Sequence, residues 1–287
     1  LAYSRGRRVA NIWRIPILTD RPATWADAQQ LTFDEAVITF MDTSPDGTQL
    51  LFNSDRRGKP DLWMMPAEGG EMQQITRDPA PDWDPDWSPD GTQIVFYSYR
   101  SGNRDIWVIP AGGGQAKQLT FDKADDVYPS WSPDGRQVAF SSNRSSDGDI
   151  WIIPSEGGEA QQVTSGPFYD GQPVWSSDGE WLIFRSFRRY GDSLWRIPAA
   201  GGDPKPIITQ AFAAPRAMAP DGKTVYFRDA GNIWSASIDG EKERPMTDLQ
   251  GKDGIPGFYA LTADERYLYF AWEEYKGDIW VADVVWE

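Results

Sequence analysis

The stretch from 82 to 120, DWDPDWSPDGTQIVFYSYRSGNRDIWVIPAGGGQAKQLT, holds one copy of the unit that decides the fold. Ser88–Gly91 fits a type I turn, because proline presets φ at the second position and glycine is favoured at the fourth. Pro110 ends a later apolar segment, because proline has no N–H to donate to a sheet. The unit therefore predicts four short strands, near 84–87, 93–98, 105–110 and 117–120.

The same turn returns at a nearly constant interval. Its complete or degraded copies begin 44, 44, 44, 43 and 43 residues apart, at Ser44, Ser88, Ser132, Ser176, Ala219 and Thr262. An aliphatic residue followed by tryptophan recurs in the same phase and ends at Trp13, Trp63, Trp107, Trp151, Trp195, Trp234 and Trp280. Gly-Gly turns and a Gln-aliphatic-Thr ending complete a fixed order of four markers. A period of about 40–45 residues with four strands in each unit is typical of propeller blades.

Apolar residues occupy both faces of the predicted strands, as in 93–98. Sheets that stack against a neighbour on each side, as propeller blades do, need this pattern. Helical periodicity is absent, which excludes an α-solenoid, and a flat β-solenoid usually has shorter rungs. We expect an all-β fold, a β-propeller with seven blades of four-stranded antiparallel sheet, with six blades as the alternative.

The number seven depends on the interpretation of the two ends. Leu1–Ser4 aligns with Val95–Ser98, so the first unit would begin at its second strand. The last unit has strands near Tyr259, at 267–271 and at 278–284, but no clear fourth strand. The total of 26 predicted strands is two short of seven blades. We therefore expect a longer polypeptide, in which a segment before Leu1 supplies two strands and completes the ring.

No Pro- or Gly-rich linker divides the chain, so we predict a single propeller domain over 1–287. Its blade repeats lie near 1–32, 33–76, 77–120, 121–164, 165–209, 210–247 and 248–287. The first repeat carries an insertion, Ile17–Ala28, between its third and fourth strands. We expect this insertion, with Trp25, to project from the face that carries the Ser-Pro-Asp-Gly and Gly-Gly turns.

The composition excludes several kinds of chemistry. The chain has no Cys and no His, which removes disulfides, thiolate nucleophiles, imidazole metal ligands and the usual hydrolase triad. The net charge of −15 argues against nucleic acid or an anionic membrane surface as a partner. No apolar run is long enough to insert this domain into a bilayer. We expect no enzyme activity, no cofactor and no bound metal.

The Trp-Ser-Pro-Asp-Gly turn, the Asp-Ile-Trp strand and the Gly-Gly hairpin resemble the WD-like repeats of TolB-family propellers. The resemblance covers almost the whole chain, and five repeats match well. Similar repeats also occur in propeller domains of prolyl-oligopeptidase-type and tricorn-type proteases and in sensor-like domains. The resemblance therefore implies the fold more firmly than the function.

For function, the TolB resemblance implies a non-catalytic scaffold that mediates protein–protein interaction in the bacterial cell envelope. The protein partner would belong to a membrane-associated complex, and the location would be periplasmic or extracytoplasmic, with an upstream segment as a tether to the membrane. The alternative is a ligand-sensing or substrate-gating propeller domain of a larger protease or receptor. Propeller lyases with similar repeats depend on histidine and metal, so the absence of histidine disfavours an enzyme.

Residues that repeat once in each blade are interpreted as structural. The strand tryptophans pack between blades, and the turn serines lack the adjacent base that a nucleophile needs. Arg100 and Arg144 share one repeat phase, and we expect each to pair with a nearby aspartate. Asp82, Asp84 and Asp86 stand at i, i+2 and i+4, which points them the same way on a regular strand. Such oxygens suit Ca²⁺ or Mg²⁺, but a solvated loop is the favoured interpretation.

Residues that differ between blades gather in the loops before the first strand and after the second strand of each unit. In a propeller these loops share one face, around the mouth of the channel. Arginine and aromatic side chains beside carboxylates are typical of binding surfaces. We predict that the partner docks there, on Asp82, Trp83, Asp84, Asp126, Tyr128, Tyr169, Asp170, Gln172, Arg188, Arg216, Phe258 and Trp272. The insertion around Trp25 is the competing anchor.

Overall fold

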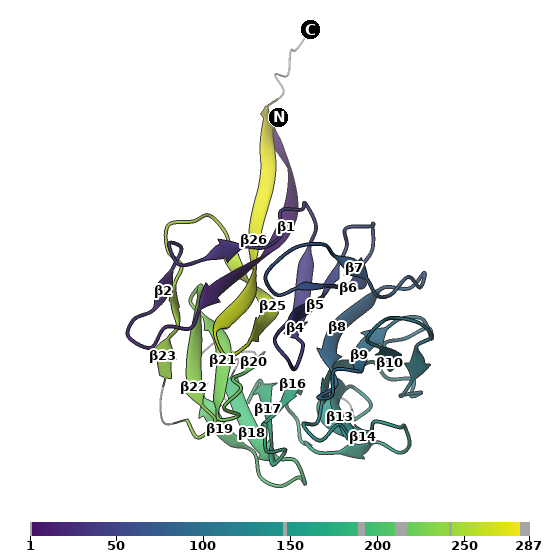
Figure 1. Ribbon diagram of the computed structural model, residues 1–287. Helices are drawn as coiled ribbons and strands as arrows, with labels where there is room; N and C mark the ends of the chain where they lie inside the picture. The colour runs from purple at the N-terminus through teal and green to yellow at the C-terminus, as the bar shows by residue number, and fades with distance from the viewer. Residues whose placement is uncertain (1, 146–147, 189–192, 210–216, 241–242, 282–287) are drawn as a thin grey trace.

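The computed structural model describes residues 2–145, 148–188, 193–209, 217–240 and 243–281, and at 2–6, 258 and 277–281 the backbone alone. Six four-stranded antiparallel sheets stand in a ring (Figure 1). The fold is all-β, as the repeat predicts, and it is a six-bladed propeller. Nowhere in the described ranges is there a helix long and apolar enough to cross a bilayer.

Blades 2 to 5 repeat one pattern, in which the first strand lies innermost and a short fourth strand lies outermost. Blade 2 contains β4 (Ile38–Thr43), β5 (Gln49–Ser54), β6 (Asp61–Pro66) and β7 (Gln73–Gln74). Blade 3 contains β8 (Asp82–Trp87), β9 (Gln93–Ser98), β10 (Asp105–Pro110) and β11 (Lys117–Gln118). Blade 4 contains β12 (Asp126–Trp131), β13 (Gln137–Ser142), β14 (Asp149–Pro154) and β15 (Gln161–Gln162). Blade 5 contains β16 (Asp170–Trp175), β17 (Trp181–Ser186), β18 (Ser193–Pro198) and β19 (Lys205–Ile208).

The remaining two blades complete the ring. Blade 6 contains β20 (Ala217–Met218), β21 (Thr224–Asp229), β22 (Asn232–Ser237) and β23 (Glu243–Pro245). Blade 1 combines β25 (Ile255–Ala263) and β26 (Tyr267–Val281) with β1 (Ala2–Pro16) and β3 (Gln29–Gln30). The inner half of blade 1 therefore comes from the end of the chain, and the outer half from its beginning.

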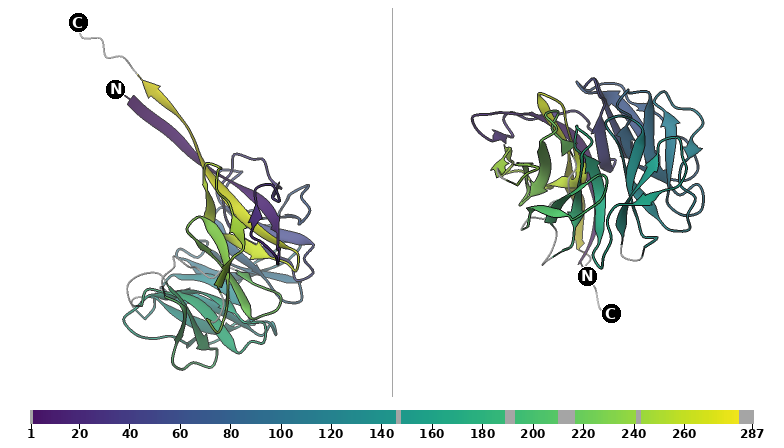
Figure 2. Two further views of the ribbon diagram at one scale, coloured as in Figure 1. Left: turned by 90° about the vertical axis from the view of Figure 1, so that its left-hand side faces the viewer. Right: turned by 90° about the horizontal axis from the view of Figure 1, so that it is seen from below.

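This closure corrects the predicted number of blades: seven is wrong, and the alternative of six is confirmed. The strand predicted at Leu1–Ser4 and the segment that ends after Trp13 belong to one strand, β1, and the strands predicted at 267–271 and 278–284 fall, as far as the structure describes them, in one strand, β26. The two pair from Ala2↔Val281 to Pro16↔Tyr267. Residues 5–10, RGRRVA, lack the turn that Gly102 makes at φ 111° in the matching loop of blade 3. The repeats predicted at 1–32 and 248–287 thus share one blade, and β25 and β26 supply the strands that were expected from upstream. Figure 2 shows the far ends of β1 and β26 as a two-stranded ribbon that leaves the propeller.

Each Ser-Pro-Asp-Gly turn is held by its own side chains. In blade 3 the Ser88 hydroxyl donates to Asp90 Oδ1 at 2.7 Å and accepts the Gln93 N–H at 2.9 Å. The Thr92 N–H also donates to Asp90 Oδ1, at 3.0 Å. These bonds, that from Ser88 first, lower the pKa of Asp90 below its usual value. The turn serine is therefore engaged within its turn, as expected of a structural residue.

The core lies between neighbouring blades. One phenylalanine from the second strand of every blade is at most 1% exposed: Phe52, Phe96, Phe140, Phe184, Phe227 and Phe270. The strand tryptophans pack beside them, and Trp63 and Trp195 are 5% and 8% exposed. Large buried aromatic surfaces of this kind supply much of the free energy that holds stacked sheets together. The structural interpretation of the tryptophans is confirmed where the structure describes their side chains.

The insertion in blade 1 lies against blade 6 and does not project as a free anchor. Its β2 (Ala23–Thr24) pairs in parallel with β24 (Thr247–Asp248), which follows the outer strand of blade 6. The Trp25 indole N–H donates to the Leu249 carbonyl at 3.0 Å. The Trp25 ring lies edge-on to Trp272, with centroids 4.6 Å apart. The expectation of a projecting insertion is wrong, because its apolar side chains are used to join blades 6 and 1.

Candidate binding surfaces

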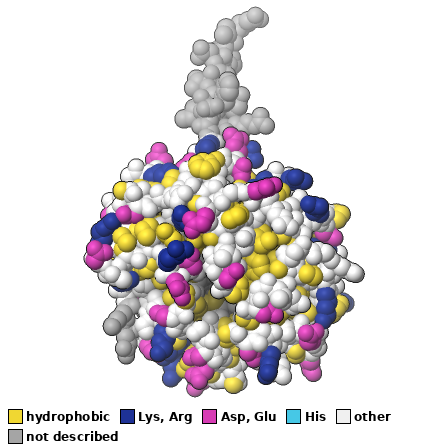
Figure 3. All heavy atoms as spheres, viewed as in Figure 1, with side chains coloured by type: hydrophobic (Ala, Val, Ile, Leu, Met, Phe, Trp, Pro, Cys, Tyr) yellow, Lys and Arg dark blue, Asp and Glu magenta, His cyan; other side chains and the backbone are white. Residues whose placement is uncertain are grey.

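The propeller has two faces. The loop face carries the connections from the fourth strand to the next first strand and from the second to the third strand. The turn face carries the Ser-Pro-Asp-Gly and Gly-Gly turns. The central channel runs between them, lined by the first strands of the blades. Acidic and basic side chains are mixed over the side of the molecule that Figure 3 shows, and neither sign gathers into one patch there.

Three of the predicted partner-binding residues are buried aspartates that bind arginine. Asp82, Asp126 and Asp170 begin the first strands of blades 3, 4 and 5, and their side chains are 0% exposed. Each pairs with the arginine eighteen residues later, and Asp82–Arg100 and Asp126–Arg144 both measure 2.7 Å. Arg188 pairs with Asp170 in the same way. We call each of these pairs a blade latch.

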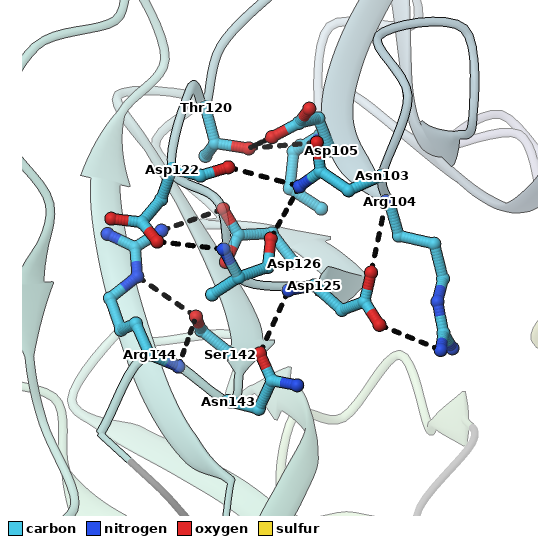
Figure 4. Close-up of polar contacts among 12 residues, drawn as sticks. Asn103, Arg104, Asp105, Thr120, Asp122, Asp125, Asp126, Ser142, Asn143 and Arg144 are labelled. Atoms are coloured by element: carbon cyan, nitrogen blue, oxygen red, sulfur yellow. Dashed lines mark hydrogen bonds and ion pairs between the residues drawn. The ribbon is translucent and has the colours of Figure 1, made fainter.

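Each latch arginine also stacks on the tryptophan of its own blade. The Arg144 guanidinium lies 4.8 Å from the Trp151 ring centroid, and Arg100 lies 5.1 Å from that of Trp107. Burial raises the pKa of Asp126, while bonds from Ser142 and Arg144 oppose this rise (Figure 4). Arginine suits this position because it stays charged when partly buried. The latch aspartates thus hold the blades and are not exposed to a partner, while the latch arginines keep 13–17% of their side-chain surface exposed.

The network of Figure 4 continues along the loop face. The Asn103 amide donates to the Asp122 carbonyl at 3.0 Å, and Arg104 pairs with Asp125 at 2.9 Å. The Asp125 N–H in turn donates to Asn143 Oδ1 at 2.9 Å. Loops from blades 3 and 4 are therefore tied together. This part of the loop face is preorganised, which reduces the entropy that a partner must remove on binding.

The spacing of Asp82, Asp84 and Asp86 predicted that their carboxylates would point the same way on a regular strand. The structure differs. A β-bulge between Trp83 and Asp86 interrupts the alternation of β8. Asp84 adopts φ 50° at this bulge, and Tyr128 and Gln172 adopt 57° and 58° at the same position of the next two blades. Bulges re-aim side chains, and left-handed φ at a non-glycine residue costs free energy. Asp84, Tyr128 and Gln172 consequently line the channel.

Two carboxyls meet in the channel. One, Asp42, comes from the first strand of blade 2, and the other, Asp86, comes from the first strand of blade 3. Asp42 Oδ2 accepts the Trp87 N–H at 2.9 Å, and Asp86 Oδ2 accepts the Trp131 N–H at 2.7 Å. Burial raises the pKa of Asp42 to about 6, and burial together with the nearby Asp42 charge raises the pKa of Asp86 well above its usual value. The two carboxyls are close enough to interact directly, so one shared proton and a single negative charge are favoured over two charges. No three acidic side chains within the described ranges form a group that could hold a metal ion.

An aromatic group narrows the channel on its loop-face side. Phe40 stacks on Tyr259 with centroids 5.1 Å apart, and Tyr128 lies 6.1 Å from Phe40 and 6.2 Å from Tyr97. These rings come from blades 1 to 4, and Phe40 and Tyr97 are only 4% and 8% exposed. We call Phe40, Tyr97, Tyr128 and Tyr259 the channel aromatic group. On the opposite side the channel widens into a hollow of about 610 Å³ among the Ser-Pro-Asp-Gly turns.

Exposed aromatic side chains occur at several places on the loop face. Phe33, Tyr99 and Phe121 are 77%, 42% and 76% exposed in its loops, and two further rings lie in blade 5. Phe168 and Phe187 are 41% and 43% exposed, and the rings of Tyr169 and Phe187 lie 5.1 Å apart. Gly148 makes room for Tyr169, because a Cβ there would stand 2.7 Å from the Tyr169 ring. We call Phe168, Tyr169 and Phe187 the loop-face aromatic patch. Of these three residues, only Tyr169 was among the predicted partner-binding residues; Phe168 and Phe187 were missed.

The other predicted partner-binding residues have separate positions. Trp83 is half-buried and packs against the core between blades 3 and 4. Trp272 is 3% exposed and lies in the core beside Trp25, so it offers no surface. Arg216 lies outside the described residues, and so does the side chain of Phe258. Of the predicted residues whose side chains the structure describes, Trp83, Tyr128, Tyr169 and Arg188 remain partly accessible.

Six closed blades with a channel place the chain among β-propeller domains. The family model for the TolB beta propeller domain matches residues 40–128 and 122–260, and the chain belongs to this family. Sequence comparison with curated proteins gives no match.

Two solved TolB structures are similar to this chain. The putative TolB from Agrobacterium tumefaciens is 22% identical, with 94% of this chain and 99% of that chain covered and a TM-score of 0.77. TolB from Acinetobacter baumannii is 16% identical, with 93% and 65% covered and a TM-score of 0.65. At these identities the similarity shows the fold.

Propellers of other proteins are also similar. A structure of the nidogen/laminin complex matches at 14% identity, covering 86% of this chain and 94% of that chain, with a TM-score of 0.68. A puromycin-hydrolyzing peptidase from Mycobacterium tuberculosis matches at 14% identity over 80% of this chain and 48% of that chain, with a TM-score of 0.56. The shared architecture therefore hosts different functions, and function has to be argued from the surfaces of this chain.

Proposed function

We propose that this propeller is a non-catalytic scaffold that binds a protein partner on its loop face, in the bacterial cell envelope. The observation that carries the proposal is the loop-face aromatic patch, Phe168, Tyr169 and Phe187, held on a rigid blade. Exposed aromatic side chains supply much of the energy of protein interfaces. Arg188 lies 5.6 Å from the Phe168 ring and is itself fixed by Asp170, so the patch has a firm support.

Family membership supports the same function. The chain matches the family model of the TolB beta propeller domain. The nidogen/laminin structure has a propeller of similar fold in a complex of proteins. The periplasmic location follows from the same family argument. The turn serines are bonded within their turns and the chain has no histidine, which supports a scaffold without catalysis.

Site-specific photo-crosslinking in cells tests the docking face. A photoreactive phenylalanine at Phe187 should capture a discrete partner, whereas the same residue at Glu159, exposed on the turn face, should not. A third position, Asp20, reports on the insertion as the competing anchor. Phe168→Ser with Phe187→Ser should reduce the yield of a partner crosslinked from Tyr99 at least tenfold. Crosslinks from Glu159 or Asp20 but not from Phe187 would assign docking to another surface.

The location and the absence of catalysis are tested separately. After expression from the native gene, osmotic shock should release the chain with the periplasmic fraction or leave it with the envelope. A cytosolic distribution would contradict the proposed location. Peptidase, esterase and lyase substrates should show no turnover above that of Ser132→Ala, in which a turn serine is removed. Turnover that this variant lowers would contradict a non-catalytic scaffold.

A further inference from the structure

The hollow on the turn face is distinct from the proposed docking surface. It measures about 610 Å³ and is lined by the Ser-Pro-Asp-Gly turns and by the first strands above them. Cavities of roughly 300–1,000 Å³ accommodate small molecules or a few residues of a peptide. The channel aromatic group narrows the opposite end. A ligand would therefore enter the channel from the turn face.

The walls of this hollow favour a positive charge. The Asp42 and Asp86 carboxyls stand in its inner wall, each fixed by a backbone N–H. At the rim, Asp264 and Glu265 add negative charge. Among the described residues that line the hollow, Arg266 is the one cation. Low-dielectric walls of one sign focus the field and raise the local concentration of counter-ions.

A second and independent observation comes from Gln172. Its side chain is 2% exposed, and neither its Oε1 nor its Nε2 has a hydrogen-bond partner in the protein. It lines a small extension of the channel, about 40 Å³, together with Asp42, Asp84 and Asp86. A buried amide without a partner costs free energy, and its left-handed φ of 58° adds to that cost. Residues kept under such strain are found preferentially at binding sites.

The carboxyl and amide oxygens of this site fit an organic cation better than a metal ion. Ca²⁺ takes about six to eight oxygen ligands, and no group of three acidic side chains with suitable geometry exists in the described part of the chain. Ammonium and guanidinium groups instead donate three to five hydrogen bonds and pair with carboxylates. Trp87 and Trp131, which are 8% and 6% exposed, also line the hollow and add apolar wall beside the carboxyls.

We propose that the turn-face hollow binds an organic cation, a group ending in ammonium or guanidinium, between the Asp42 and Asp86 carboxyls and the Gln172 amide. The carboxyls accept hydrogen bonds from the cationic head, and Gln172 Oε1 accepts a further one. The apolar stem of the ligand lies along Trp87 and Trp131. The cation is either a free small molecule or a lysine or arginine side chain of a partner.

Titration calorimetry with defined probes tests this site. Agmatine represents a free cation, and an acetylated, amidated Gly-Arg-Gly peptide represents a side chain. The matched peptide with citrulline in place of arginine has the same shape without the charge. At least one charged probe should bind with one-to-one stoichiometry and at least ten times more tightly than the citrulline peptide. Tighter binding of agmatine indicates a free ligand, and tighter binding of the peptide indicates a partner side chain.

Variants separate the site from general attraction to an acidic protein. Asp42→Asn with Asp86→Asn should weaken binding at least tenfold. Glu71→Gln with Glu159→Gln removes at least as much negative charge at exposed positions and should leave affinity within twofold. Gln172→Leu should weaken binding at least threefold without lowering the melting temperature, because it removes unpaired polar atoms. If the variant with both aspartates replaced folds poorly, Gln172→Leu still tests the site.

Four results would overturn the proposal. The first is no saturable binding of either charged probe, and the second is equal binding of the citrulline peptide. The third is unchanged affinity in Gln172→Leu together with unchanged affinity in the folded aspartate variant. The fourth is displacement of the cationic probe by stoichiometric Ca²⁺, which would assign the carboxyls to a metal.

Discussion

In blades 3 to 5, the blade latch joins a buried aspartate, an arginine and a tryptophan, whereas blade 1 builds the same region from aromatic rings beside the ion pair Arg8–Glu273. Pro256 stands opposite Trp272 in blade 1, where Asp82 stands opposite Ser98 in blade 3. Trp272 packs against Trp25 of the insertion. The Lys252 ammonium lies 3.7 Å from the Trp13 ring centroid, as the latch arginines lie over their tryptophans.

The difference shows two solutions to one packing problem. A repeated blade can use a polar latch, because every member comes from the blade itself or from the strand just before it. Blade 1 combines the two ends of the chain, so its contacts must be made between segments far apart in sequence. Apolar burial is less directional than a buried ion pair and tolerates this arrangement more easily. The insertion provides the extra apolar surface that the closing junction requires.

The largest expected effect is the loss of one latch. Arg144→Ala leaves the Asp126 carboxylate buried without its cation, which should lower the free energy of unfolding by about 3–5 kcal/mol. Urea denaturation of the variant measures this loss. Arg136→Ala, whose side chain is 85% exposed, is the control and should stay within about 0.5 kcal/mol. A loss below about 1 kcal/mol for Arg144→Ala would mean that the latch is not important for stability.

The aromatic counterpart should have a somewhat smaller effect. Trp25→Ala removes contacts to Trp13 and Trp272 at centroid distances of 5.1 and 4.6 Å. We expect a loss of about 2–4 kcal/mol, because the ring is only half-buried. Hydrogen exchange should increase in β1, β24 and β26 but not in blades 3 to 5. Uniform destabilisation of all blades would contradict a local role in closing the ring.

A substitution in the Asp42–Asp86 pair should raise the stability of the fold, whereas the two substitutions above lower it. The pKa of both carboxyls is raised in the folded state, so the folded chain holds protons that the unfolded chain releases. Their contribution to stability is therefore present at acidic pH and is lost as pH rises through about 6. Asp86→Asn keeps an acceptor for the Trp131 N–H and removes the repulsion. It should raise stability at pH 8 by about 1–2 kcal/mol.

The check is the difference in unfolding free energy between the wild type and Asp86→Asn, measured from pH 4 to 8. Other buried carboxyls, such as Asp82 and Asp126, contribute equally to both proteins and cancel. The difference should grow with pH. A constant difference would mean that the two carboxyls do not interact in the folded state.

The smallest effect should come from an exposed ion pair beside the latch. Arg104 and Asp125 are 2.9 Å apart, but their side chains are 37% and 32% exposed. Arg104→Ala should cost less than about 1 kcal/mol, because solvent and salt screen such pairs. A loss equal to that of Arg144→Ala would remove the distinction between buried latch and exposed loop contacts.

The blades were predictable because their signals are local. Strands at 93–98 and 105–110 begin and end as the turn residues and Pro110 indicate. The closure was not predictable in the same way, because β1 and β26 are long strands without internal turns whose pairing joins opposite ends of the chain. Local patterns place strands, but they do not show which distant strand will be the neighbour.

The candidate sites divide along the same line. The latch aspartates and arginines are eighteen residues apart in three blades, and this constant spacing, which includes Arg188, was available in the sequence. The residues that line the channel could not be predicted from the sequence, because the residue types at Asp84, Tyr128 and Gln172 do not indicate a positive φ. Gln172 was named as a candidate for the loop face, and the bulge turns it into the channel instead.

The ribbon of β1 and β26 has a mechanical consequence. Its two strands are antiparallel, and their far ends, near Ala2 and Val281, lie side by side at the tip (Figure 2). Tension applied at these two ends would load the cross-strand hydrogen bonds one at a time, as a zipper opens, because such bonds run perpendicular to the strands. Opening would then proceed into blade 1 and split the ring at its closing sheet while blades 2 to 5 stayed folded. The propeller would therefore open at its closing sheet under a small pulling force applied at these two ends.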